Sequence, residues 1–130
     1  MRAKEIQREL ELDGLAPVVV IDDAENATPL ANALLDGGIW FMEITFRTSA
    51  AAEAIKNVAT NVPKMIVGAG TILNVEMAKK AVEAGAKFIV TPGYSKEVVK
   101  WCHENDVAVI PGTQTMTEIM YAINDGCELV

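Results

Sequence analysis

Short apolar runs alternate with amphipathic segments along the chain. Most positions within each run are apolar in succession, which is typical of strands buried on both faces. The runs are spaced about 20 to 25 residues apart and begin near Ala16, Ile39, Lys64, Lys87 and Val107, with a shorter sixth run at Cys127. We therefore predict five buried strands and a possible sixth over residues 127–130.

The segments between these runs carry apolar residues at helical spacing. Three such sets are Leu30, Leu34 and Leu35; Val75, Ala78 and Val82; and Val98, Val99 and Cys102. Helix boundaries are also indicated, because asparagine, serine and threonine favour amino caps and glycine favours a left-handed closing position. The predicted caps are Asn74, Ser95 and Thr115 with Glu118 in a capping box, and the predicted closing residues are Gly37, Gly85 and Gly126.

Repeated strand–helix units of this length predict an α/β fold with a parallel sheet covered by helices. Two architectures fit, an open doubly wound sheet and a closed eightfold (β/α)8 TIM barrel, and the length of 130 residues favours the open sheet. A dinucleotide-binding version is not supported, because Gly68-Ala69-Gly70 is followed by Leu73 where the third glycine of that fingerprint belongs. The pattern leaves the open sheet and a partial barrel as alternatives.

Composition narrows the class of protein without naming a function. The chain is 51% hydrophobic and 22% charged, as expected of an ordinary globular domain, and its net charge of −7 argues against nucleic-acid binding through a basic face. The longest apolar run, residues 15–21, is far shorter than the roughly twenty residues a membrane span needs. With only Cys102 and Cys127, which we expect to be reduced, we predict a cytoplasmic protein that binds neither nucleic acid nor membrane.

The carboxyl end of the second predicted strand carries the candidate chemistry. Ligands gather at the carboxyl ends of strands in both architectures, and here the sequence reads Glu43-Ile44-Thr45-Phe46-Arg47. Alternation places Glu43 on the same side as Ile39 and Phe41, so burial would raise its pKa unless a cation compensates. A carboxyl whose pKa lies near neutrality is suited to proton transfer. The plainer interpretation is that Glu43 forms a structural ion pair with a lysine or arginine.

The later strand ends supply binding groups but no acid or base. Gly68-Ala69-Gly70-Thr71 could bring backbone amides and a hydroxyl to an anion, or could form a tight turn. We expect the ends of the fourth and fifth strands to be rigid loops at the edge of the site, with the sequences Thr91-Pro92-Gly93 and Pro111-Gly112-Thr113. Since His103 is the only histidine, a multi-histidine metal site is excluded and we expect it on a helix surface. Trp40 and Met42 alternate with Glu43 along the second strand and should point to its opposite face. We therefore expect both to be core residues packed under helices.

Four of these strand ends in register resemble one known family. Met42-Glu43-Ile44-Thr45-Phe46-Arg47-Thr48, Ile66-Val67-Gly68-Ala69-Gly70-Thr71, Val90-Thr91-Pro92-Gly93 and Ile110-Pro111-Gly112 closely resemble the 2-keto-3-deoxy-6-phosphogluconate and 4-hydroxy-2-oxoglutarate aldolase family. The resemblance runs through almost the whole chain. It implies a TIM barrel, of which this chain would form about the first five and a half units, with residues 1–13 as a leading helix and residues 15–130 as the strand–helix units of a single domain.

The resemblance also implies a function. Members are class I aldolases that cleave a keto acid to pyruvate and an aldehyde through a lysine Schiff base, without metal or organic cofactor, and commonly as trimers. Carried over by position, Glu43 would be the catalytic acid and base. Arg47 and Thr71 would hold the substrate carboxylate beside Gly70, and Pro92 would line the pocket. The small-molecule partner would be pyruvate or a related keto acid, in Entner–Doudoroff carbohydrate metabolism.

The family's imine-forming lysine is expected outside these residues. It lies in a Lys-Phe-Phe-Pro run on the sixth strand, and Glu128-Leu129-Val130 corresponds to the residues immediately before it. We therefore expect the 130-residue chain alone to be inactive and to associate through an unpaired strand edge. The alternatives are a non-catalytic open-sheet protein that binds a small carboxylate and a truncated fragment without function of its own.

Overall fold

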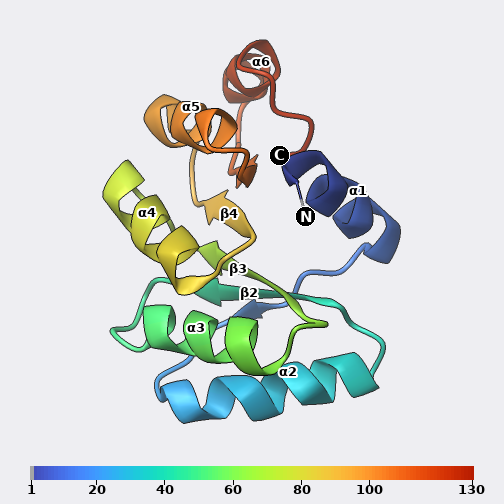
Figure 1. The fold of residues 1–130 in the computed structure, drawn as a ribbon. Helices are drawn as coiled ribbons and strands as arrows, with labels where there is room; N and C mark the ends of the chain where they lie inside the picture. Colours follow the sequence, from blue (N-terminus) through green and yellow to red (C-terminus); the bar gives the residue numbers. More distant parts are fainter. Residues whose placement is uncertain (1) are drawn as a thin grey trace.

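The computed structural model describes residues 2–130, which form a five-stranded parallel sheet surrounded by helices (Figure 1). The strands are β1 (Val18–Val19), β2 (Phe41–Thr45), β3 (Ile66–Gly70), β4 (Phe88–Thr91) and β5 (Ala108–Pro111). The helices are α1 (Ala3–Asp13), a short 3-10 turn η1 (Ala24–Asn26), α2 (Ala27–Asp36), α3 (Ala51–Asn61), α4 (Val75–Ala84), α5 (Lys96–Glu104) and α6 (Met116–Asn124).

The order of the strands distinguishes the two architectures. The strands lie side by side in sequence order, β1-β2-β3-β4-β5, and every neighbouring pair is parallel. A doubly wound sheet reverses its strand order at a switch point, whereas a (β/α)8 barrel adds each strand beside the previous one. The fold is therefore a partial barrel, and the open sheet is excluded.

The two faces of the sheet are covered differently. Alternate strand residues such as Met42, Ile44 and Val67 pack outward with α2 to α5 in the larger core cluster. The inner face carries a smaller cluster of Ile6, Phe41, Phe88 and Ala108, in which the two phenylalanine rings lie 5.8 Å apart. Ile6 belongs to α1, so this helix closes the inner side of the sheet near the amino ends of the strands (Figure 1).

The predicted helix caps are present in the structure. The side chains of Asn74, Ser95 and Thr115 accept hydrogen bonds from Met77, Val98 and Glu118 backbone amides, and Thr115 with Glu118 forms the capping box. These caps satisfy amide groups that would otherwise lack partners in the first helical turn. They fix where α4, α5 and α6 begin, and hence how long each strand-to-helix loop is.

Two local predictions were wrong. Gly37 is right-handed, with φ −81°, and the left-handed closing residue of α2 is Gly38, with φ 83°, because the helical hydrogen bonding continues through Gly37. Gly85 and Gly126 are left-handed as predicted. The predicted sixth strand is absent from the described residues, since a strand needs backbone bonds to a neighbour and the Cys127 amide instead bonds Ala122 O at the end of α6.

None of the helices within residues 2–130 has the length and apolar character needed to span a bilayer.

Candidate active site at the carboxyl ends of the strands

The structure places the Glu43 side chain on the inner face of the sheet. Its neighbours Met42 and Ile44 pack outward, while Glu43 pairs in register with Gly68 and is only 8% exposed. The carboxyl lies over the backbone of Gly70, where an added Cβ would be 2.6 Å from Glu43 Cδ and would overlap Oε1. Gly70 is therefore required here because the position of a side chain is occupied by the carboxyl of Glu43.

Burial governs the electrostatics of this carboxyl. Loss of solvation raises the pKa of Glu43 above its ordinary value, and the positive charge of Arg47 opposes that rise without cancelling it. Within residues 2–130, the two side chains form no direct ion pair, since Glu43 is absent from the salt bridges of the structure. Glu43 is therefore a buried carboxyl without a direct ion-pair partner among the described residues, and a carboxyl pKa raised in this way is suited to proton transfer.

Arg47 is held at the same end of the sheet by β3. Its Nε donates a hydrogen bond of 3.2 Å to Thr71 Oγ1, while the side chain stays exposed to solvent. Thr48 donates from Oγ1 to Ile21 O, which ties the loop after β2 to the segment after β1. The two terminal guanidinium nitrogens of Arg47 do not bond Thr71, and they can donate bidentate hydrogen bonds to a carboxylate.

Thr71 has a strained backbone. Its φ of 58° lies in the left-handed region, which a β-branched residue rarely adopts. Strain of this kind persists only when the surrounding structure enforces it, and it gathers at functional sites. Here it directs the Thr71 hydroxyl toward Arg47 immediately after β3 ends.

The loops that follow β4 and β5, which were predicted to be rigid, contact each other at the carboxyl ends of the strands. Thr91 Oγ1 donates to Gly93 O at 2.7 Å, and the Gly112 amide donates to Thr91 O at 2.8 Å. A Cβ on Gly112 would lie 2.5 Å from Pro92 O, so the two loops are in close contact. Pro92 itself is exposed, at the same end of the sheet as Glu43. We call Glu43, Arg47, Gly70, Thr71 and Pro92 the carboxyl-end site.

Sequence reasoning missed Thr45 at this site. Thr45 shares the inward parity of Glu43, pairs in register with Gly70 and is fully buried. Its Oγ1 is the one buried side-chain oxygen or nitrogen among the described residues that has no hydrogen-bond partner. The signal was available, because a hydroxyl two residues beyond an inward carboxyl on a strand must face the same way.

Three of the described lysines lie close to a strand end in the sequence. Lys64 lies two residues before β3 and Lys87 immediately precedes β4, so both are at the end of the strands opposite the carboxyl-end site. Lys96 follows β4 but forms an ion pair with Asp125 at 3.6 Å. His103 is exposed on α5, as predicted.

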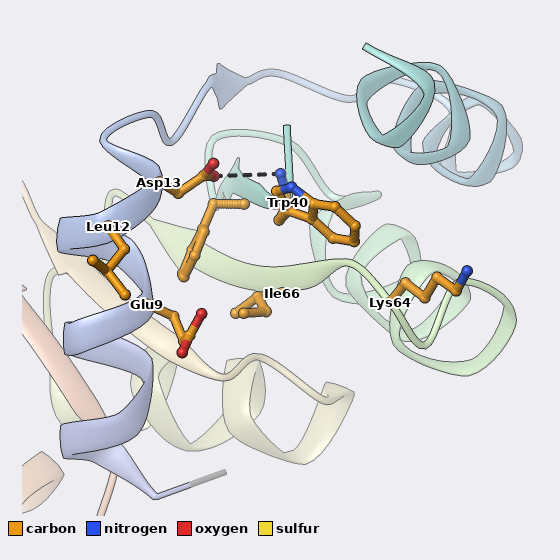
Figure 2. Close-up of a pocket in the computed structure, with 7 residues that line it drawn as sticks. Glu9, Leu12, Asp13, Trp40, Lys64 and Ile66 are labelled. Carbon is orange, nitrogen blue, oxygen red and sulfur yellow. Dashed lines mark hydrogen bonds between the residues drawn. The ribbon is translucent and has the colours of Figure 1, made fainter. Parts of the chain in front are cut away.

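A cavity of about 440 Å³ lies at the amino ends of β2 and β3, where Figure 2 shows α1 facing the sheet. Trp40 lies here with 48% of its surface exposed, which corrects the prediction that it is a core residue under helices. The reason is its place just before β2, where its amide donates to Asp13 Oδ2 at 3.4 Å. Met42 is fully buried, as predicted. We call this the amino-end cavity, lined by Glu9, Leu12, Asp13, Trp40, Phe41, Lys64 and Ile66.

Comparison with known proteins assigns the chain to a family. A family model described as KDPG and KHG aldolase matches residues 6–130. A 2-dehydro-3-deoxy-phosphogluconate aldolase of Treponema pallidum is 46% identical over 121 residues, or 93% of this chain and 58% of the relative. The KHG/KDPG aldolase of Escherichia coli is 40% identical over 86% of this chain and 53% of its own length.

The fold agrees with these relatives. The crystal structure of the Zymomonas mobilis 2-keto-3-deoxy-6-phosphogluconate aldolase matches with a TM-score of 0.89 and 37% identity, covering 97% of this chain and 60% of that one. A Legionella pneumophila KDPG aldolase captured with pyruvate as a covalent carbinolamine matches with a TM-score of 0.82 and 35% identity, over 85% of this chain and 54% of that one. The chain spans little more than half the length of the curated relatives it matches, and it belongs to the KDPG and KHG aldolase family.

Proposed function

We propose that this chain supplies the acid–base and carboxylate-binding part of a class I aldolase that releases pyruvate from a 2-keto-3-deoxy-6-phosphogluconate or 4-hydroxy-2-oxoglutarate type substrate. The observation that carries the proposal is the buried Glu43 carboxyl, whose pKa is raised by burial, at the same strand ends as the Arg47–Thr71 pair. Glu43 can thus exchange protons with the substrate while Arg47 and Thr71 bind its carboxylate.

The reaction requires an electron sink next to the bond that breaks. A lysine amine adds to the substrate keto group and loses water, which gives an iminium. When the carbon–carbon bond breaks, its electron pair moves into the iminium to form an enamine, and the neighbouring hydroxyl loses its proton as the aldehyde forms. Protonation of the enamine carbon then makes the pyruvate methyl, and water releases the lysine.

Glu43 is the group we assign to these proton transfers, acting through a water molecule. Because burial favours its neutral form, the carboxyl can donate a proton and then take one back at the same position. Arg47 and Thr71 bind the substrate carboxylate, and the exposed Pro92 lines the pocket. The iminium supplies the electron sink, so the proposed chemistry uses no metal or organic cofactor.

We propose that the imine-forming lysine comes from polypeptide outside these 130 residues, as in the Lys-Phe-Phe-Pro run of the family. This agrees with the positions of Lys64 and Lys87 before the opposite ends of the strands, and with the ion pair that Lys96 forms with Asp125. On this proposal the 130 residues alone are inactive. The aldehyde product would be glyceraldehyde 3-phosphate or glyoxylate, and a cytoplasmic trimer remains the predicted assembly.

A chimera provides the test. Residues 1–130 are fused to the carboxyl-terminal remainder of the Zymomonas mobilis aldolase, and pyruvate release is followed with lactate dehydrogenase. We expect the chimera to release pyruvate, Glu43→Gln to reduce kcat by at least about 100-fold, and the control Glu53→Gln, at an exposed position on α3, to change nothing.

Borohydride trapping locates the lysine. With pyruvate and borohydride, we expect a stable pyruvyl adduct on the grafted segment of the chimera and none on the 130-residue chain. A folded chimera that forms no pyruvate, or one that tolerates Glu43→Gln, would refute the proposed function. An adduct on a lysine within residues 1–130 would refute the assignment of the lysine.

A further inference from the structure

The buried, unpartnered hydroxyl of Thr45 is a feature that the proposed reaction does not use. Buried polar atoms are almost always hydrogen-bonded, and each exception in a folded protein requires an explanation. Thr45 Oγ1 is such an exception, in a residue with no exposed surface. The loss of hydration of an unpaired hydroxyl costs free energy that a valine of the same shape would avoid.

The register of the sheet places this hydroxyl beside the candidate acid–base group. Thr45 lies directly opposite Gly70, and Glu43 lies opposite Gly68 on the same inward face. The Glu43 carboxyl reaches along the strand and lies over Gly70, which brings it to the level of Thr45. Neighbouring parallel strands are about 4.8 Å apart, so the carboxyl and the Thr45 side chain occupy adjacent positions on the inner face.

Few other groups compete for the carboxyl. In register, Val18 of β1 and Gly68 of β3 flank Glu43, and neither carries a charge or a polar side chain. The ring of Phe88 in β4, which is apolar, packs against Gly68. Arg47 is the charged side chain that acts on Glu43, and its Nε is engaged by Thr71. Thr45 therefore offers the neutral donor nearest in register to the carboxyl.

We propose that Thr45 is a positioning residue for Glu43. The Thr45 hydroxyl donates a hydrogen bond to the ionised Glu43 carboxylate, and this bond breaks when the carboxylate takes up a proton. A threonine hydroxyl can make and break such a bond by turning about its own Cα–Cβ bond between staggered positions. The bond would stabilise the ionised state in which Glu43 accepts a proton from the substrate. This deepens the proposed function, since it rests on the acid–base role of Glu43.

The test measures the titration of Glu43 directly in the 130-residue chain. The carboxyl carbon of Glu43 is assigned by its absence in Glu43→Gln and followed by carbon-13 NMR as the pH is raised. A hydrogen bond to an ionised group lowers its pKa, so we expect Thr45→Val and Thr45→Ala each to raise the Glu43 midpoint by about one pH unit. Thr45→Ser keeps the hydroxyl, and we expect it to titrate at the wild-type midpoint.

The serine and alanine variants form the decisive pair, because they differ only in the hydroxyl. If all three variants leave the midpoint unchanged, or if all three raise it equally, the hydroxyl has no such role and the proposal is overturned. Thermal unfolding of each variant shows whether the chain is folded during the titration.

The same variants in the chimera connect this result to catalysis. There we expect the acidic limb of kcat against pH to move upward in Thr45→Val and to be restored in Thr45→Ser, with KM for the substrate little changed. A change confined to KM would contradict the proposal. Because the NMR titration does not depend on turnover, it still decides the role of Thr45 if the chimera proves inactive and the proposed function fails.

Discussion

The two ends of the same strands carry similar side chains in very different environments. At the amino-end cavity, Glu9 and Lys64 are exposed, and one carboxylate oxygen of Asp13 accepts a hydrogen bond from the backbone amide of Trp40 (Figure 2). At the carboxyl-end site, Glu43 is 8% exposed and lies over a glycine. The presence of charge therefore does not distinguish the two ends; the burial of one carboxyl and the backbone that surrounds it do.

Gly70→Ala is expected to have the largest effect on this contrast. The added methyl overlaps the Glu43 carboxyl, which has to move or force the strands apart. We expect the free energy of unfolding to fall by about 1–3 kcal/mol and pyruvate release by the chimera to fall about 100-fold. Urea unfolding and the coupled assay measure the two effects.

The matched control is Gly93→Ala, because a Cβ at Gly93 meets no atom within 4 Å. We expect this change to alter stability by about 0.5 kcal/mol or less. If both substitutions lowered the free energy of unfolding equally, the contact between Gly70 and the Glu43 carboxyl would not be the cause of the Gly70→Ala effect.

Glu43→Gln is expected to have an intermediate effect on stability that depends on pH. The folded-state pKa of Glu43 is raised, so the folded state binds more protons than the unfolded state between the ordinary carboxyl pKa and the raised one. Stability is therefore lost as the pH rises through that window, and glutamine removes the loss. We expect the variant to be more stable than wild type near neutrality and to gain nothing in acid.

Urea unfolding across this pH range checks the expectation, with Glu53→Gln as the exposed control. A stability gain for Glu43→Gln that is the same at all pH values would show that burial of the charge is not its cause.

Trp40→Ala tests the other end of the strands and is expected to have the smallest effect on chemistry. The ring is half exposed in the amino-end cavity, so we expect a loss of stability of about 1 kcal/mol with kcat of the chimera and the Glu43 titration unchanged. Kinetics and carbon-13 NMR measure these quantities. A shift of the Glu43 midpoint in this variant would show that the two ends are coupled.

Much of the fold could be predicted from local patterns. Consecutive apolar residues identify the five strands, because both faces of each strand are buried, and the caps at Asn74, Ser95 and Thr115 identify helix starts. The inward direction of Glu43 follows from alternation along one strand. These features depend on residues close together in the chain.

The features that the sequence did not predict depend on distant contacts. The amphipathic pattern of α1 does not state which surface it covers, and its packing of Ile6 on the inner face is set by Phe41 and Phe88. Trp40 has the parity of a core residue but precedes β2, and about half of its surface stays exposed. Thr45 is fully buried beside Gly70 of the neighbouring strand β3, and no single motif encodes this contact between two strands.

We expect Glu43 and Arg47 to act on each other at the carboxyl ends of the strands, and titration of the Glu43 carboxyl in Arg47→Leu measures this coupling. Because the guanidinium charge lowers the pKa of Glu43, we predict that its removal raises the midpoint, while Arg8→Leu, at an exposed position on α1, leaves it at the wild-type value. A Glu43 midpoint that is unchanged in a folded Arg47→Leu chain, or that moves equally in both variants, would contradict the account.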